Sequence, residues 1–384
     1  MYVLLLMMEV YSLISLSFVS YINTNPKIVK FRISPLIVLL FFMWGGVLPA
    51  QEAFAGLEFD EPNPLFQSET PLRVKWKYSD RDVRKNTNDS TYLDCTLSYQ
   101  LEDGTWDSLE VMVRARGNWR QENCFLTPVK LRIKKSERKG TLFKGNKELK
   151  MVLPCRNNDP GQDYVLKEYM AYKMYEVVSP FHFKTRRVAL DFTDDRGRKE
   201  KNYQLEAFLI EDTKEVADRC HAKRLRRTVH PLQQDDLACT QNDFYQFLIG
   251  NTDYSVAYQH NQKLLFVEGM QAIPVPYDFD MSGLVDANYA VVSQVAGEQL
   301  PIDRVTDRLY RGYKRDNGIY EQVRQQYIAS KGDILARAAA LKPDFRDVKQ
   351  YESARKFLLE FFDILEDPAR YKRMVIDRAQ VLKD

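Results

Sequence analysis

The pattern of hydrophobic and polar positions divides the chain into a first half rich in strands and a second half rich in helices. In the first half, several segments alternate between apolar and polar residues, which is typical of half-buried strands. Tyr164–Val178 instead has apolar residues at helical spacing and predicts one helix within this half. The predicted strands are Leu72–Tyr78, Tyr92–Gln100, Leu109–Arg116, Pro128–Lys135, Arg187–Thr193 and Tyr203–Ile210, of which the last two form a hairpin.

After Glu211 the spacing of apolar residues becomes mostly helical, with two short strands near the middle of the chain. This order predicts an α+β fold with two lobes joined by a hinge, and interdomain clefts of that kind usually bind small ligands. The predicted parts are a linker (residues 51–65), a β-rich N-terminal lobe (66–210) and a mostly helical C-terminal lobe (211–384). The later elements are Gln241–Ile249, Lys263–Val267, Ala272–Tyr277, Gln322–Leu341, Val348–Glu366 and Pro368–Asp384.

Residues 1–50 contain two apolar stretches that precede the predicted lobes. The second, Pro35–Leu48, follows a basic patch and ends near small residues, as a secretory signal does. It is short for a membrane span. The first, Tyr2–Tyr21, is either a spanning helix or the product of a translation start placed too early. Both alternatives predict export to the periplasm, the cell envelope or the medium, with membrane attachment only if the apolar segment is retained.

Composition and charge narrow the class of protein. Of 384 residues, 45% are hydrophobic and 28% are charged, which is typical of a globular protein. The formal net charge is +3, and residues 1–50 hold three basic residues and one acidic residue. The remainder is therefore close to neutral, with both signs interspersed. This balance argues against a nucleic-acid partner.

Five cysteines are compatible with export, because disulfides persist in oxidising compartments. Cys124 and Cys155 flank one predicted β-region, and Cys220 and Cys239 flank one loop. We expect these two pairs, with Cys95 left over, although spacing alone does not fix connectivity. The alternative is five buried thiols. None of the cysteines has the spacing of a zinc site.

The segment Asn251–Gly283 carries the strongest chemical signal. Asp253 follows a predicted helix, Asn261 precedes a strand, and Asp278 and Asp280 end the next strand. This layout predicts three carboxylates and an amide at one end of a hairpin. Clustered carboxylates repel unless a cation lies between them, and oxygen ligands suit Mg²⁺. A carboxylate off the metal can accept the proton of an attacking hydroxyl. The alternative is that these residues cap turns.

A second set of residues lies in the first half of the chain. Arg116, Gly117 and Asn118 end a predicted strand, and a glycine turn can cover phosphates with its backbone N–H groups. We expect Lys130, on the returning strand, to reach the phosphates and Glu168, on the next helix, to hold this lysine. Alternatively, the lysine belongs to the solvated face of its strand, since alternation predicts that equally well.

The run Arg219–Arg227 contains five basic residues. Such a run can recognise acidic peptides or phosphate groups, or it can be a solvated face.

Together these motifs resemble the CotH kinase-like family, which comprises spore coat CotH-type atypical, secreted protein kinases. The likeness extends over roughly residues 110–312. It rests on Arg116-Gly117-Asn118, Tyr164–Tyr175, Asn251-Thr252-Asp253, His260-Asn261 and the segment Pro276–Gly283.

The resemblance implies a two-lobed, protein-kinase-like fold and transfer of phosphate from ATP to hydroxyls of an exported or envelope protein, with Mg²⁺ or Mn²⁺. By motif, Asp253 is the catalytic residue, Asn261 and Asp278 bind the metal, and Asp280 shares it. Arg116, Gly117, Asn118, Lys130 and Glu168 are the nucleotide-binding candidates. Two alternatives stay open: an inactive pseudokinase that acts as an envelope structural or assembly factor, and a hydrolase that uses two carboxylates.

Overall fold

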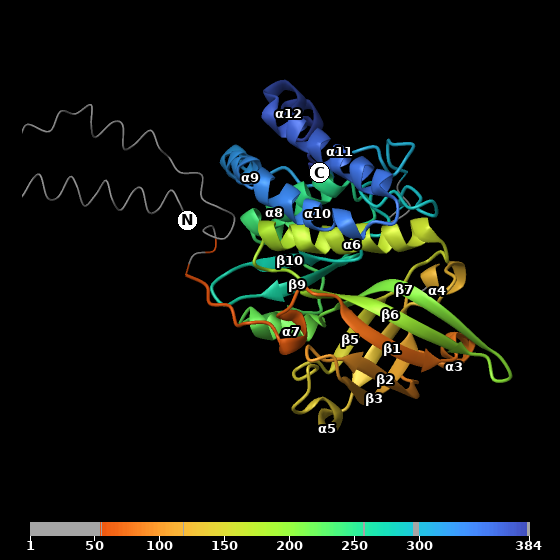
Figure 1. Ribbon diagram of the computed structural model, residues 1–384. Coiled ribbons are helices and arrows are strands. Elements are labelled where there is room, and N and C mark those ends of the chain that lie inside the picture. The colour runs from red at the N-terminus through yellow and green to blue at the C-terminus, as the bar shows by residue number, and fades with distance from the viewer. Residues whose placement is uncertain (1–53, 55, 118, 256–257, 295–298, 382–384) are drawn as a thin grey trace, which may run out of the picture. The chain divides into compact units, whose positions relative to one another are not determined.

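The computed structural model describes residues 54, 56–117, 119–255, 258–294 and 299–381 (Figure 1). By backbone contacts, the chain divides into one unit of residues 1–46 and a second of residues 47–384, which contains all the described residues. Three features used in the sequence analysis lie outside the described residues: the two N-terminal apolar stretches and Asn118. Among the residues that are described, none forms a helix with the length and apolar character needed to cross a membrane.

Seven strands form a closed barrel in the order β1-β2-β3-β4-β5-β7-β6. All neighbours are antiparallel except β1 and β6, which pair in parallel and close the barrel. The strands are β1 (Leu72–Tyr78), β2 (Leu93–Gln100), β3 (Trp106–Ala115), β4 (Val129–Ile133), β5 (Glu148–Val152), β6 (Thr185–Asp195) and β7 (Glu200–Ile210).

The barrel interior is filled by the apolar member of each alternating pair. On β1, for example, Val74 and Trp76 are buried while Arg73 and Lys75 are exposed. Side chains of this kind from all seven strands make one continuous core, because successive residues on a strand point to opposite faces. The core includes Val74, Trp76, Leu97, Val111, Leu131, Met151, Leu190 and Leu205.

The prediction of an α+β fold is confirmed, but the prediction of a two-lobed, protein-kinase-like fold is wrong. Its N-terminal part is a closed mixed barrel rather than an open antiparallel sheet. Alternation identifies the buried face of each strand, but it does not reveal that β1 pairs with β6 and closes the barrel. The sequence analysis also missed β5, the strand that joins β4 to β7.

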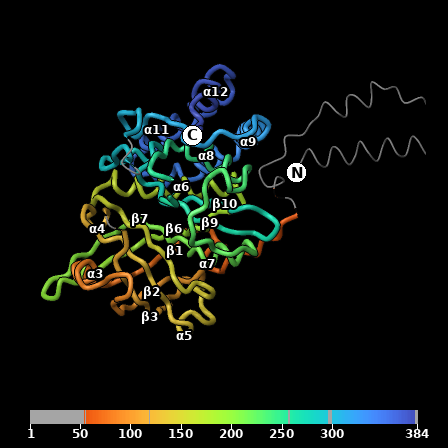
Figure 2. Tube along the Cα trace, turned by 180° about the vertical axis from the view of Figure 1, so that it is seen from behind, coloured from red at the N-terminus to blue at the C-terminus, as the bar shows by residue number. Residues whose placement is uncertain are grey.

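The second part of the described unit is helical and is organised around α6 (Asp159–Val178). This helix lies between barrel strand β7 and the C-terminal helices, as Figures 1 and 2 both show. It is buried on nearly all sides, which explains why its sequence has no clear polar face. The longer helices around it are α8 (Asp236–Ile249), α9 (Asn317–Ala329), α10 (Lys331–Ala340) and α11 (Val348–Glu366).

The remaining elements connect these parts. A three-stranded sheet has the order β10-β9-β8 and consists of β8 (Lys223–Leu225), β9 (Gln262–Phe266) and β10 (Ala272–Pro276). The shorter helices are α3 (Asp80–Asn86), α4 (Trp119–Asn123), α5 (Lys135–Arg138), α7 (Thr213–Arg219) and α12 (Pro368–Met374). The 3-10 turns are η2 (Pro64–Phe66), η3 (Pro231–Gln233), η5 (Lys342–Asp344) and η6 (Ile376–Arg378).

One of the two predicted disulfides is present. The bond between Cys124 and Cys155 is confirmed. It joins the end of α4 to the segment between β5 and α6. The pairing of Cys220 with Cys239 is wrong, because both are buried free thiols. Cys220 caps the end of α7, whereas Cys239 packs beside Tyr254 from within α8. The two cysteines therefore pack in different surroundings, although they flank the same loop.

Candidate functional site

The end of the β9–β10 hairpin brings Asn261 and Asp278 together. The backbone N–H of Tyr277 donates to the carbonyl of Asn261 at 3.0 Å, so Asp278 follows directly after this pair. Both Asn261 and Asp278 have left-handed backbones, with φ of +53° and +66°. Asn and Asp tolerate this conformation better than other non-glycine residues, and such strain is often found at functional sites.

The segment after β10 is attached to the C-terminal end of α8. Gly283 N–H donates to the carbonyl of Gly250 at 3.0 Å, and Leu284 N–H donates to the carbonyl of Ile249 at 2.9 Å. A Cβ at Gly283 would lie 2.5 Å from the carbonyl oxygen of Val305, so the close approach of these two backbone segments requires glycine at position 283. Since the loop with Asp253 begins where α8 ends, this attachment places both acidic segments at the same end of the helix.

Asp253 accepts three side-chain hydrogen bonds. Asn261 donates to Oδ2 at 2.9 Å, while Ser293 donates to Oδ1 at 2.9 Å and His260 Nε2 lies 3.2 Å from Oδ1. A carboxylate oxygen can accept two such bonds, so Oδ2 keeps one acceptor position. The side chain is 25% exposed, and this position can be reached by another molecule. The hydrogen bond to Asp253 also raises the pKa of His260.

Asp278 and Asn261 have oxygen atoms that are free to bind a metal. The phenol of Tyr172, on α6, accepts the Asp278 N–H at 2.9 Å, which fixes the backbone. Within residues 54–381 as described, the Asp278 carboxylate and the Asn261 amide oxygen make no hydrogen bond or ion pair.

The donor set fits a metal that is held partly by phosphate. The described residues contain no group of three or more His, Cys, Asp or Glu side chains placed to hold a metal ion. Mg²⁺, however, is usually bound by one or two carboxylates together with phosphate oxygens and water. Asp278 with Asn261 matches that arrangement, but it does not make a cage that would hold a metal alone.

Asp280 and Glu168 are buried on either side of Arg120. The nearest oxygen of Asp280 lies 3.7 Å from Arg120 Nε, and that of Glu168 lies 3.9 Å from an Arg120 Nη. Burial raises the pKa of both carboxyls, and Arg120 opposes the rise. The predicted role of Glu168 was to hold a strand lysine, but the structure brings it to an arginine on α4 that the sequence analysis missed.

The disulfide segment positions Arg120. Arg120 donates to the carbonyl of Leu153 at 3.3 Å, and the N–H of Phe125 donates to the carbonyl of Cys155 at 3.0 Å. The Cys124–Cys155 bond thus fastens α4 against the segment that runs from β5 into α6. Nevertheless, Asp280 Oδ2, Glu168 Oε1 and two Arg120 nitrogens are buried without a hydrogen-bond partner. Arg120 therefore neutralises the two carboxylates through ion pairs that are longer than hydrogen bonds.

Four basic side chains lie beside the acidic groups and form what we call the basic row: Arg116, Lys150, Lys263 and Arg224. The ammonium groups of Lys150 and Lys263 lie 4.2 Å and 4.9 Å from the ring centre of Tyr277. Burial and, next, the charge of Arg116 lower the pKa of Lys150 to about 7. Burial and the charge of Arg224 lower the pKa of Lys263. None of the four has an ion-pair partner among the described residues.

The sequence analysis predicted that Lys130, rather than Lys150, would reach the phosphates. Lys130 forms ion pairs with Glu148 and with Asp212, the latter at 3.7 Å, and it does not meet Glu168. Lys150 lies directly opposite Lys130 on β5. It was missed because β5 was missed, although a lysine directly before the apolar run 151–153 is an unusual pattern for a solvated strand.

The turn after β3 is next to the basic row. Gly117 has a left-handed backbone with φ of +67°, which glycine adopts without cost. Arg116 has a buried Nε with no hydrogen-bond partner. Its charge favours a lower pKa for Lys150, Glu168 and Asp280, so it lies near all three. The structure therefore places Arg116 with the acidic residues, while Asn118 lies outside the described residues.

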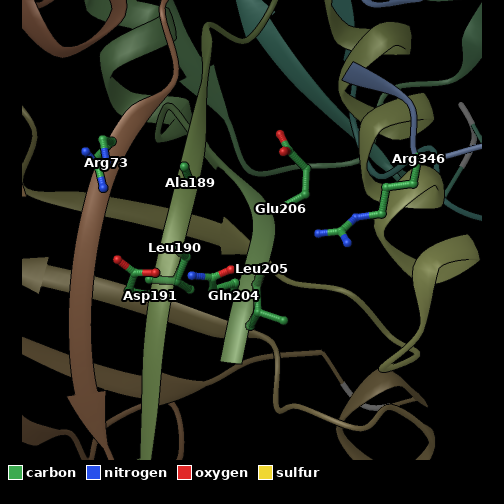
Figure 3. A pocket seen from close by; sticks show the side chains of 8 residues that line it. All are labelled: Arg73, Ala189, Leu190, Asp191, Gln204, Leu205, Glu206 and Arg346. Atoms are coloured by element: carbon green, nitrogen blue, oxygen red, sulfur yellow. The ribbon is translucent and has the colours of Figure 1, made fainter. Parts of the chain in front are cut away.

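A separate hollow on the barrel contains none of the predicted site residues (Figure 3). Its volume is about 260 Å³, and its charged side chains are mostly engaged elsewhere. Glu206 pairs with Arg187 at 2.8 Å, and Arg346 pairs with Asp159 at 3.0 Å. We therefore place the chemistry at the residues around Asp253 and Asp278.

Replacing Arg120 with Met is expected to destabilise the protein by about 3 kcal/mol at about pH 8 and by much less at about pH 5. The change leaves Asp280 and Glu168 buried without a cation, and their raised pKa values rise further. A carboxyl with a raised folded-state pKa loses its contribution to stability as pH rises through that pKa. Denaturant unfolding at both pH values measures the difference.

The exposed pair of Arg304 with Asp307 supplies the control. Arg304→Met is expected to change stability little at either pH, because exposed ion pairs contribute little. An equal cost of Arg120→Met at both pH values would contradict the assignment of Arg120 as the cation that neutralises the two acids.

No protein-family model, curated protein or solved structure matches the chain.

Proposed function

We propose that this protein is an exported, metal-dependent phosphotransferase that moves the terminal phosphate of ATP to hydroxyl groups of another protein. The motif resemblance to the CotH kinase-like family suggests the reaction, and the proposal does not depend on a kinase-like fold. The Cys124–Cys155 disulfide is consistent with export.

The basic row is the observation that carries the proposal. Arg116, Lys150 and Lys263 are partly buried, and none of them has an ion-pair partner in the described residues. Burial and the charges of Arg116 and Lys263 together lower the pKa of Lys150. Holding like charges together costs free energy unless an anion binds between them. A polyphosphate supplies several negative charges, and charge-assisted hydrogen bonds to it would satisfy Arg116 and Lys150.

The acidic residues opposite the row fit the other half of the same reaction. Asp278 and the Asn261 amide oxygen would hold the metal, which would supply positive charge to neutralise the transferred phosphate group. Arg120 keeps Asp280 and Glu168 from adding unneutralised negative charge near those phosphates.

In this proposal, Asp253 accepts the proton of the hydroxyl group that is phosphorylated. The acceptor hydroxyl would donate a hydrogen bond to the open position on Asp253 Oδ2, while Asn261 and Ser293 hold the carboxylate in place. As the hydroxyl oxygen forms its bond to the γ-phosphorus, its proton passes to Oδ2. The bond from phosphorus to the β–γ bridging oxygen breaks, and ADP leaves with that electron pair.

The two opposed lysines give a direct test of the nucleotide site. Lys150→Met is expected to weaken ATP binding by roughly thirtyfold, since a charge-assisted bond to phosphate contributes about 2 kcal/mol. Lys130→Met should change the affinity by less than about threefold, because Lys130 is already neutralised by Glu148 and Asp212.

Isothermal titration with ATP and Mg²⁺ measures both affinities. Equal losses in the two variants, or no loss in Lys150→Met, would contradict the assignment of the basic row as the phosphate site.

A further inference from the structure

The basic run Arg219–Arg227 is divided by the structure into a buried part and an exposed part. Arg219 is buried, forms an ion pair with Glu211 at 3.2 Å and donates to the carbonyl of His182 at 2.6 Å. It therefore belongs to the interior. Lys223, Arg226 and Arg227 are exposed and have no ion-pair partner among the described residues.

Lys223 lies on β8, an edge strand of the small sheet, and Arg226 and Arg227 follow directly after this strand. The strand order β10-β9-β8 leaves β8 paired on one side only, within the described residues. Lys223 stands opposite Phe266 of β9, which is an exposed aromatic residue. An unpaired strand edge offers backbone N–H and C=O groups to an extended segment of another chain. We call Lys223, Arg226, Arg227 and this edge of β8 the basic edge.

The basic edge is directly connected to the site. The side chain of Gln259 donates to the carbonyl of Arg227 at 2.5 Å, and the next residue, His260, contacts Asp253. Arg224, on β8 itself, lies close enough for its charge to favour a lower pKa for both Lys263 and Tyr277. A segment lying along the basic edge would therefore run toward Asp253, which we propose as the proton acceptor.

We infer that the basic edge binds an extended, acidic segment of the protein that accepts the phosphate. This inference rests on the proposed function and adds the class of acceptor to it. Charge complementarity selects the occupant: the chain beyond residue 50 is close to neutral overall, yet this edge carries only positive charge. Such complementarity steers encounter and suppresses partners of the wrong sign.

Two peptides and two variants test the inference. A Glu- and Asp-rich peptide with one Ser is compared with the same peptide carrying Lys at the acidic positions, by fluorescence anisotropy with the full chain. The acidic peptide is expected to bind, and its binding should weaken as salt is added. The K223E/R226E/R227E variant is expected to bind it about tenfold or more weakly.

The matched control is R198E/K199E/K201E, which reverses three exposed basic residues around the β6–β7 turn and should leave peptide binding unchanged. Equal binding of both peptides, or equal effects of the two triple variants, would overturn the inference. Binding of phosphatidylglycerol vesicles in place of the acidic peptide would also overturn it, because the edge would then contact a membrane.

Failure of the docking surface and failure of the proposed phosphate transfer give different results. Acidic-peptide binding that depends on the basic edge, without any phosphate transfer, would support the docking surface and contradict the proposed reaction. Phosphate transfer at equal rates to both peptides would support the reaction and contradict the acidic acceptor.

Discussion

Asp253→Asn is expected to reduce phosphate transfer by about a thousandfold, within the usual range for loss of a general base. Asparagine keeps the shape of the side chain, and its oxygen can still accept hydrogen bonds from Asn261 or Ser293. It cannot accept the proton of the incoming hydroxyl. ATP affinity should change by less than about threefold, because Asp253 contacts the acceptor rather than the nucleotide.

Single-turnover phosphate transfer and equilibrium ATP binding, measured on the same preparation, separate these effects. Asp333→Asn, an exposed position on α10, is the control and should change neither quantity. A parallel loss of binding and transfer in Asp253→Asn would instead place Asp253 at the nucleotide.

Asp278→Asn is expected to weaken metal-dependent ATP binding by about a hundredfold, because the metal then loses its charged protein ligand. Asparagine is the informative substitution here. The backbone of Asp278 is left-handed, a conformation that asparagine tolerates and alanine does not. The fold is therefore retained while the carboxylate charge is removed.

Titrations of ATP with Mg²⁺, with Mn²⁺ and with a chelator measure this effect. The unmodified protein should bind ATP more tightly with either metal than with the chelator. Asp278→Asn should bind ATP with nearly the same, low affinity in all three conditions. A full metal effect in the variant would remove Asp278 from the metal site.

The sequence predicted local structure better than the way its elements are assembled. β1 and α11 have the predicted bounds, since their patterns of buried residues are uninterrupted. Barrel closure depends on parallel pairing of β1 with β6, which are distant in sequence, and no local pattern encodes that pairing.

The acidic half of the site could be predicted because its residues lie within one short segment. Asp253, Asn261 and Asp278 meet at a hairpin end, where sequence spacing and spatial distance agree. Of the basic residues, Arg116 was predicted, but Arg120 and Lys150 were missed. Arg120 is positioned by the disulfide segment and Lys150 by the barrel, and no local pattern encodes either placement.

Phosphate transfer by the protein with its disulfide formed is the measurement that tests the central claim most directly. The protein is incubated with ATP and Mg²⁺ or Mn²⁺, alone and with an acceptor protein, and intact masses are read beside Asp253→Asn and Asp278→Asn. We predict a gain of one phosphate mass or more with the unmodified protein only. Absence of any gain, with ATP still bound, would contradict the phosphotransferase and favour a nucleotide-binding protein without catalysis.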